Sequence, residues 1–94
     1  MRWVFAIIDK SGRKIHLSSQ RWAHIHKHPE MMNQLEQMKD ALVHPDKIIE
    51  FDVDPAVRFY YRYDKTRQAF LLVSVKYLNG EGFVITSFYT DKIR

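Results

Sequence analysis

The sequence predicts an α+β fold in which an N-terminal β-hairpin and two short helices precede an antiparallel sheet. Three observations support this prediction. Residues 3–8 and 14–17 are rich in β-forming side chains, and turn-forming residues separate them. Residues 20–43 carry apolar side chains at helical spacing. Residues 46–89 read as β-rich segments separated by polar turns.

Two helices are expected between the hairpin and the sheet. The serine pair at 18–19 can cap the first helix, residues 20–27. The helix should end at His28, because a residue before proline avoids helical geometry. Pro29 suits the first position of a second helix that runs to about Val43. Its apolar side chains recur at helical spacing: Met31, Leu35, Met38 and Leu42.

The rest of the chain predicts the strands of an antiparallel meander. The clearest hairpin signal is the Asn-Gly-Glu-Gly sequence at 79–82. This order predicts that both helices pack on one face of the sheet. The expected strands are residues 46–51, 57–63, 69–78 and 83–89.

Length and composition favour one domain over residues 1–94. The apolar share of 46% and aromatic share of 14% are typical of folded proteins. A core of this size is thin, so a homodimer that buries more surface is an expected alternative to a monomer.

The sequence also indicates a compartment and a class of partner. The N-terminal apolar run is short and lacks a cleavage site, and no segment is apolar enough for a membrane helix, so a cytoplasmic protein without a membrane partner is expected. The absence of cysteine excludes disulfides and thiolate metal sites. The net charge of +4 favours a polyanionic partner such as RNA.

The first helix carries the residues best suited to proton transfer. Arg21, His24 and His28 fall within about 60° of one another on a helical wheel, beside the side chains expected to be buried. An imidazole at the border between core and solvent can act as a general acid or base. The residues expected to be buried are Trp22, Ile25 and Pro29.

Two other interpretations of these histidines stay open. Exposed histidines on a helix commonly have no function. His24 and His28 are four residues apart and can bind one metal ion, but no cysteine offers a third ligand and Glu30 lies beyond the proline. We therefore expect no metal or cofactor. His16 and His44 carry no predicted role.

Strand alternation suggests a basic surface on the sheet. Arg58, Tyr60 and Arg62 share one side of their strand, Lys76 lies on one side of the next, and Thr86 and Thr90 share a side of the last. We expect these cations and hydroxyls to form a common surface, although an ordinary solvated face is the alternative. A one-residue slip in register would exchange the faces of Arg62 and Tyr61.

These residue types suit one reaction in particular. RNA carries its own nucleophile, the 2′-hydroxyl, so a protein without metal need only move protons and stabilise charge at the phosphate. Arginine matches the phosphate oxygens. Exposed aromatic side chains can stack on unpaired bases, and the candidates are Tyr60, Tyr61 and Tyr89.

Several motifs resemble one family. Arg21-x-x-His24-Ile25-x-x-His28-Pro29-Glu30-Met31, then Pro45-Asp46, Tyr60-Tyr61-Arg62 and residues 85–90 resemble small phage- and mobile-element-associated domains. Those domains are grouped with the barnase, EndoU, colicin and RelE-like ribonucleases. The resemblance spans residues 14–93 and implies a RelE/barnase-like fold.

The resemblance also implies residue roles. His24 would be the general acid or base, with His28 as its alternate or partner. Arg62 would bind the phosphate and Thr86 would position it, with Thr90 as a substitute. Flanking phosphates would be held by Arg21, Arg58 and Lys76.

The predicted function is therefore a metal-independent, toxin-like or phage-associated endoribonuclease that leaves a 2′,3′-cyclic phosphate. A cognate antitoxin or inhibitor protein is an expected partner. The alternative function is a non-catalytic module that uses the same basic face to hold RNA or a protein.

Overall fold

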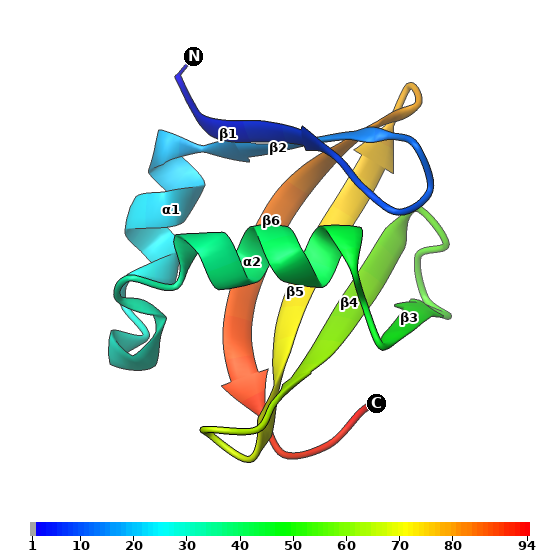
Figure 1. Cartoon of the computed structure of the whole chain (residues 1–94). Helices are drawn as coiled ribbons and strands as arrows, with labels where there is room; N and C mark the ends of the chain where they lie inside the picture. The colour runs from blue at the N-terminus through cyan, green and yellow to red at the C-terminus, as the bar shows by residue number, and fades with distance from the viewer. Residues whose placement is uncertain (1) are drawn as a thin grey trace.

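The computed structural model describes residues 2–94, and it confirms the α+β class. These residues form a six-stranded mixed sheet with strand order β1-β2-β6-β5-β4-β3 (Figure 1). The predicted strands and the first helix begin and end within about two residues of their observed limits. The elements are β1 (Trp3–Ile8), β2 (Lys14–Ser18), α1 (Ser19–Ile25), the 3₁₀ helix η1 (Pro29–Met31), α2 (Leu35–Val43), β3 (Lys47–Glu50), β4 (Val57–Asp64), β5 (Ala69–Leu78) and β6 (Glu81–Thr90).

The prediction of a simple antiparallel meander is wrong at one junction. Strands β3 to β6 do pair antiparallel in sequence order, and so do β1 and β2. The hairpin joins this sheet through a parallel pairing of β2 with β6, in which Ile15 opposes Gly82 and His16 opposes Phe83. Alternation within a strand does not encode which distant strand lies beside it, so this junction could not be predicted from the sequence.

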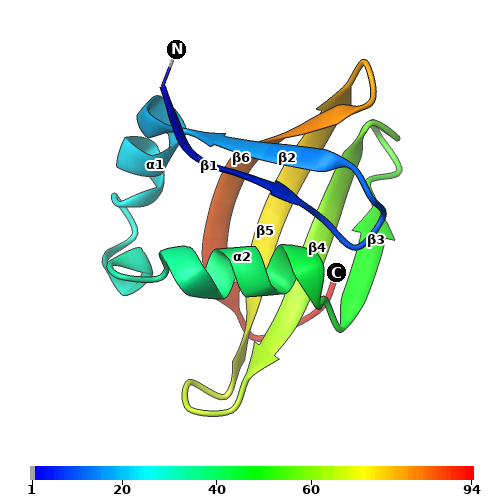
Figure 2. The same ribbon diagram turned by 45° about the horizontal axis from the view of Figure 1, so that its top comes forward.

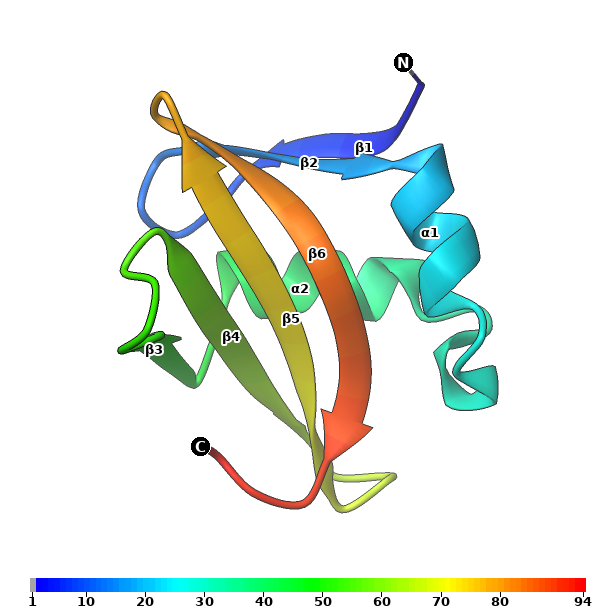
Figure 3. The same cartoon turned by 180° about the vertical axis from the view of Figure 1, so that it is seen from behind.

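The core lies between β4–β6 on one side and α2 with the β1–β2 hairpin on the other. Figure 2 shows the hairpin and α2 crossing the same side of these strands. Figure 3, seen from behind, shows no helix across the other side, and α1 lies beside β6. The expectation that both helices cover one face is therefore correct only for α2. The core residues include Phe5, Ile15, Leu17, Ile25, Met31, Met38, Leu42, Tyr60, Leu71, Val73, Val75, Tyr77 and Val84.

The predicted second helix is not continuous. A single 3₁₀ turn follows Pro29, and α2 starts only at Leu35. Between them Asn33 has a φ of 63°, a left-handed conformation that interrupts a right-handed helix. The break lets Met31 enter the core, where it is fully buried, while Pro29 is exposed contrary to expectation.

A buried carboxylate at the hairpin turn holds the two sides of the core together. Asp9 is 5% exposed, and its Oδ2 accepts hydrogen bonds from the hydroxyls of Tyr60 and Tyr77, the latter at 2.7 Å. Its Oδ1 accepts bonds from Ser11 N and Arg13 N, each at 2.9 Å. The turn of the β1–β2 hairpin is thereby joined to β4 and β5 across the core.

The ionisation of this cluster follows from its contacts. Burial raises the pKa of Asp9, but the hydrogen bonds from Tyr60, Ser11, Tyr77 and Arg13 outweigh it, so the pKa lies below its usual value. Burial and the neighbouring carboxylate raise the pKa of Tyr77 to about 12. Burial, with the hydrogen bond to Asp9, also raises the pKa of Tyr60. The cluster is therefore held as one anion and two neutral phenols.

We predict that the free energy of unfolding falls at both ends of the pH range. The contribution of Asp9 is complete above about pH 4 and is lost as pH falls through its lowered folded-state pKa. The contribution of Tyr77 is complete below about pH 10 and is lost as pH rises towards 12. Urea unfolding across this range measures both losses.

The control is Asp9→Asn, which should cost about 1–3 kcal/mol at neutral pH by leaving donors poorly matched. Its acid-side slope should be shallower than that of the wild type, because residue 9 no longer titrates. Equal slopes in the two proteins would contradict this assignment.

Gly82 makes the β2–β6 junction possible. A Cβ atom at this position would overlap Ile15 Cδ1 and lie 2.8 Å from Val75 Cγ1. Only a residue without a side chain therefore allows β2 to approach β6 here. The same close approach brings His16 beside Phe83 on the next residue pair.

We predict that Gly82→Ala lowers the free energy of unfolding by about 1–3 kcal/mol through overpacking. In an Ile15→Val background the cost should be smaller, because that change removes the methyl group that the new Cβ meets. A double-mutant cycle by thermal or urea unfolding measures the coupling. Additive effects would show that the two side chains do not compete for this space.

Candidate functional site

The strand register decides which predicted site residues share a face. Residues directly opposed on neighbouring strands point to the same side of a sheet. Arg62 opposes Leu71 and Arg58 opposes Val75, and both partners belong to the core. The two arginines therefore lie on the face covered by α2 and the hairpin, which we call the covered face.

The hydroxyl residues lie on the opposite side. Ser74 opposes both Phe59 on β4 and Thr86 on β6, so all three share the uncovered side of the sheet. We call this side the open face; its central residues are Phe59, Tyr61, Leu72, Ser74, Thr86 and Phe88. The predicted common surface of the two arginines with Lys76 and Thr86 is therefore wrong, because each strand was assigned its face without knowledge of the register.

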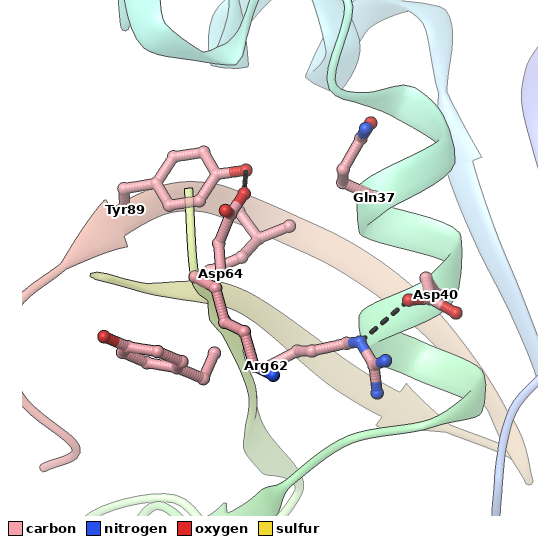
Figure 4. Close-up of a pocket in the computed structure, with 8 residues that line it drawn as sticks. Gln37, Asp40, Arg62, Asp64 and Tyr89 are labelled. Carbon is pink, nitrogen blue, oxygen red and sulfur yellow. Dashed lines mark hydrogen bonds and ion pairs between the residues drawn. The ribbon is translucent and has the colours of Figure 1, made fainter. Parts of the chain in front are cut away.

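On the covered face, Arg62 has structural partners. Its Nε lies 2.8 Å from Asp40 Oδ2 of α2, and its Nη1 donates to the His44 carbonyl oxygen at 2.5 Å. Figure 4 shows the side chain extended towards Asp40 at the rim of a cavity of about 230 Å³. Arg62 thus joins β4 to the C-terminal half of α2.

The other covered-face residues are also engaged. The Tyr89 hydroxyl donates to Gln34 Oε1 at 2.6 Å, and burial raises the pKa of Tyr89. The Arg58 guanidinium lies 5.3 Å from the centre of the Tyr77 ring. Tyr60 is fully buried with its hydroxyl on Asp9. These contacts leave the predicted substrate roles of Arg58, Arg62 and Tyr89 without support in the geometry.

The open face contains a groove of about 370 Å³. Aromatic rings, aliphatic and hydroxyl side chains form its floor, and two cations from the C-terminal segment line it. Sheet faces that bind unpaired nucleic acid combine these groups, because rings stack on bases while cations meet phosphates. The lining residues are Phe59, Tyr61, Leu72, Ser74, Thr86, Phe88, Thr90, Lys92 and Arg94.

The C-terminal segment lies against one end of this groove. The backbone N–H of Arg94 donates to the Tyr61 hydroxyl at 3.2 Å. The Arg94 guanidinium lies 5.0 Å from the centre of the Phe51 ring and 5.6 Å from that of Phe59. Arg94 therefore brings to the open face the guanidinium that Arg62 was expected to supply.

The two candidate histidines are separated by the end of α1. The helix stops at Ile25, so the helical-wheel position predicted for His28 does not apply. The His28 ring lies 5.8 Å from the Phe88 ring, at the side of the groove. His24 lines a different depression with Arg21 and Lys27 on α1. Of the two imidazoles, only that of His28 contacts a residue that lines the groove.

Lys76 and Arg21 share a second cavity on the open-face side, of about 330 Å³. Lys76 Nζ lies 3.1 Å from Asp54 Oδ2, and this hydrogen bond is the main cause of the lowered pKa of Asp54.

Within residues 2–94, no group of three or more His, Asp or Glu side chains is arranged to hold a metal ion. In the same range, no helix is long and apolar enough to cross a membrane.

Sequence reasoning missed several open-face residues. It assigned no role to Ser74, Phe59, Phe88 or Arg94. The sequence contained a signal for these residues, since Phe59 and Tyr61 lie on one side of β4 and Phe88 shares its side of β6 with two threonines.

No protein-family model matches this chain, and no curated protein or solved structure is significantly similar to it.

We predict that Arg62→Ala weakens folding slightly and leaves RNA binding unchanged. Both partners of the ion pair are about half exposed, with side chains 39% and 47% accessible, so the loss should be at most about 1 kcal/mol. Asp40→Ala is the matched control, and unfolding and gel-shift assays measure the two properties. A loss of RNA affinity in Arg62→Ala that Asp40→Ala does not share would restore Arg62 to the binding site.

Proposed function

We propose that this protein is a metal-independent, toxin-like endoribonuclease that binds unpaired RNA on the open face. The observation that carries the proposal is the combination of rings, hydroxyls and cations in one groove, with the His28 imidazole beside it. The resemblance of residues 21–31 to barnase- and RelE-like ribonucleases supports the same reaction. The positive net charge of +4 favours attraction of the polyanion.

The aromatic floor favours single strands over duplexes. Bases in a duplex are stacked on one another, whereas unpaired bases can stack on protein rings for about 1–3 kcal/mol each. Phe59 and Phe88 are partly exposed and come from the two outer strands of the groove. Tyr61, Leu72 and Ser74 between them are at most 7% exposed, so Phe59 and Phe88 are the rings of the groove that a base can reach.

The reaction requires few groups. His28 would accept the proton of the 2′-hydroxyl as its oxygen attacks phosphorus, and the leaving 5′-oxygen would take a proton from water. The new O2′–P bond and the broken P–O5′ bond give a 2′,3′-cyclic phosphate and a 5′-hydroxyl. Thr86 would donate a hydrogen bond to the phosphate, while Arg94 and Lys92 would offset its charge.

A second candidate function is RNA binding without cleavage on the same face. One observation favours it: within residues 2–94 no side-chain hydrogen bond orients the His28 ring. A general base is usually held by a third group, although such contacts often tighten only when substrate is bound. The two functions therefore differ in the role of His28 and agree on the surface.

We predict that the purified protein cleaves a labelled, unstructured RNA in EDTA and that His28→Ala slows cleavage by about 10²–10⁴-fold. His24→Ala is the control, because it removes an exposed imidazole that lies away from the groove. Thr86→Val should also slow cleavage while preserving the shape of the side chain. Product ends are identified by their 2′,3′-cyclic phosphate.

A different pattern would change the conclusion. Cleavage lost in His24→Ala and kept in His28→Ala would move the catalytic centre to α1. RNA retention by the wild type on a gel shift without any cleavage would favour the binding module. Activity that EDTA removes would exclude the metal-independent reaction.

A further inference from the structure

The β1–β2 hairpin forms a second cavity on the open-face side that the proposed reaction does not use. This cavity lies where β1, β2 and α1 meet β5 and β6, and its volume is about 330 Å³. We call it the hairpin pocket; the lining residues that matter here are Trp3, His16, Arg21, Lys76 and Phe83. It exists because the close pairing of β2 with β6 places His16 beside Phe83.

Three rings form one wall of the hairpin pocket. The His16 ring lies 4.5 Å from that of Trp3 and is stacked on Phe83 at 5.2 Å with 20° between planes. His16 Nε2 lies 2.8 Å from Glu81 Oε1, which fixes the orientation of the central ring. Trp3 is 39% exposed, so its ring is accessible to a ligand. The wall is thus a prearranged surface for a flat ring.

Two cations accompany this wall. Arg21 forms no salt bridge with the other described residues, so its guanidinium is free to bind an anion. The Lys76 side chain is 42% exposed, and its Nζ forms a salt bridge with Asp54 Oδ2 at 3.1 Å. An arginine fork matches phosphate oxygens in two parallel hydrogen bonds. A wall of aromatic rings, with Trp3 tilted by 37° to His16 and by 42° to Phe83, next to a guanidinium without a salt bridge has the chemistry of a nucleotide site.

His16 supplies a further indication of a ligand. Its side chain is more than nine-tenths buried, and its Nδ1 has no hydrogen-bond partner among residues 2–94. The Glu81 carboxylate accepts a hydrogen from Nε2, so the second ring nitrogen is the one left without a partner among these residues. Buried polar atoms without a partner are uncommon. A polar group of a ligand, such as the amino group of a base or a ribose hydroxyl, would satisfy Nδ1 if binding displaced the atoms that cover it.

The hairpin pocket continues the groove along the same strands. Ser74 in the groove and Lys76 in the pocket are alternate residues on one side of β5, about 7 Å apart. On β6, Ile85 has no partner in β5, and this bulge lies between Val84 of the pocket and Thr86 of the groove. The distance suits successive nucleotides of one extended strand.

We propose that the hairpin pocket seats a nucleotide adjacent to the one that reacts in the groove. Its base would stack on Trp3 with Phe83 against its edge, and its phosphate would bind Arg21. This inference rests on the proposed ribonuclease function and makes the substrate an unpaired stretch of RNA instead of a single reactive dinucleotide.

The experiment follows Trp3 directly. In a Trp22→Phe background Trp3 is the remaining tryptophan, and a labelled 2′-O-methyl hexanucleotide cannot be cleaved. Binding, measured by anisotropy of the label, should quench Trp3 emission. Phe83→Leu, which keeps an apolar side chain, and Arg21→Ala should each weaken binding about tenfold. Lys10→Ala, which removes a charge on the hairpin turn, is the matched control.

Kinetics with cleavable RNA complete the test. Phe83→Leu should raise KM and leave kcat within about twofold, whereas His28→Ala lowers kcat. Binding of the labelled RNA without a change in Trp3 emission, or equal affinity in all variants, would overturn the proposal that a nucleotide binds in the hairpin pocket. So would absence of binding. Quenching without cleavage of unmodified RNA would retain the pocket and remove the ribonuclease function.

Discussion

The architecture depends on the burial of the Asp9 carboxylate. The β1–β2 hairpin meets β6 through only a short parallel pairing, so the strand ladder alone does not fix the hairpin across the core. Asp9 fixes it by accepting hydrogen bonds from tyrosines of β4 and β5. The next residue adds a backbone bond from Lys10 N to the Leu42 carbonyl oxygen of α2. These contacts hold strands, helix and hairpin around one core and make that side of the sheet the covered face.

Because the hairpin and α2 cover one face, the cations on the two faces have different surroundings. On the covered face Arg62 and Arg58 pack against protein partners, and their guanidinium groups contribute to the fold. Phe59 and Phe88 lie on the open face, which no helix of residues 2–94 crosses (Figure 3). The cations that line the groove with those rings, Lys92 and Arg94, come from the C-terminal segment. The side of the sheet available to a ligand is therefore the one opposite the core.

Sequence reasoning succeeded where the signal is local. The alternation of apolar residues and the Asn79-Gly80 turn predicted the strands, and the two sides of β4, of β5 and of β6 after its bulge were assigned correctly. It failed where the answer depends on a distant pairing. The offset that sets Arg62 opposite Leu71 decides which side is covered, and alternation within one strand contains no such information.

The candidate site shows the same limit. His28 was placed on the helix with His24 because no local signal showed that α1 ends before the His-Pro step instead of at it. The extra residue of β6 at Ile85 likewise shifts the alternation within a strand that looks regular in sequence. The resemblance suggested an imidazole, a threonine and an arginine for the site, and the arginine that lines the groove with Thr86 is Arg94 and not Arg62.

The central claim is that RNA binds the open face, and ultraviolet crosslinking tests it most directly. A short unpaired RNA containing photoreactive uridine would be irradiated with the wild-type protein, and crosslinked residues would be identified by mass spectrometry. The account predicts crosslinks at Phe88 and Phe59, the partly exposed rings of the groove. Crosslinks concentrated on Tyr89 and the cavity around Arg62 would contradict it, because those residues lie on the covered face.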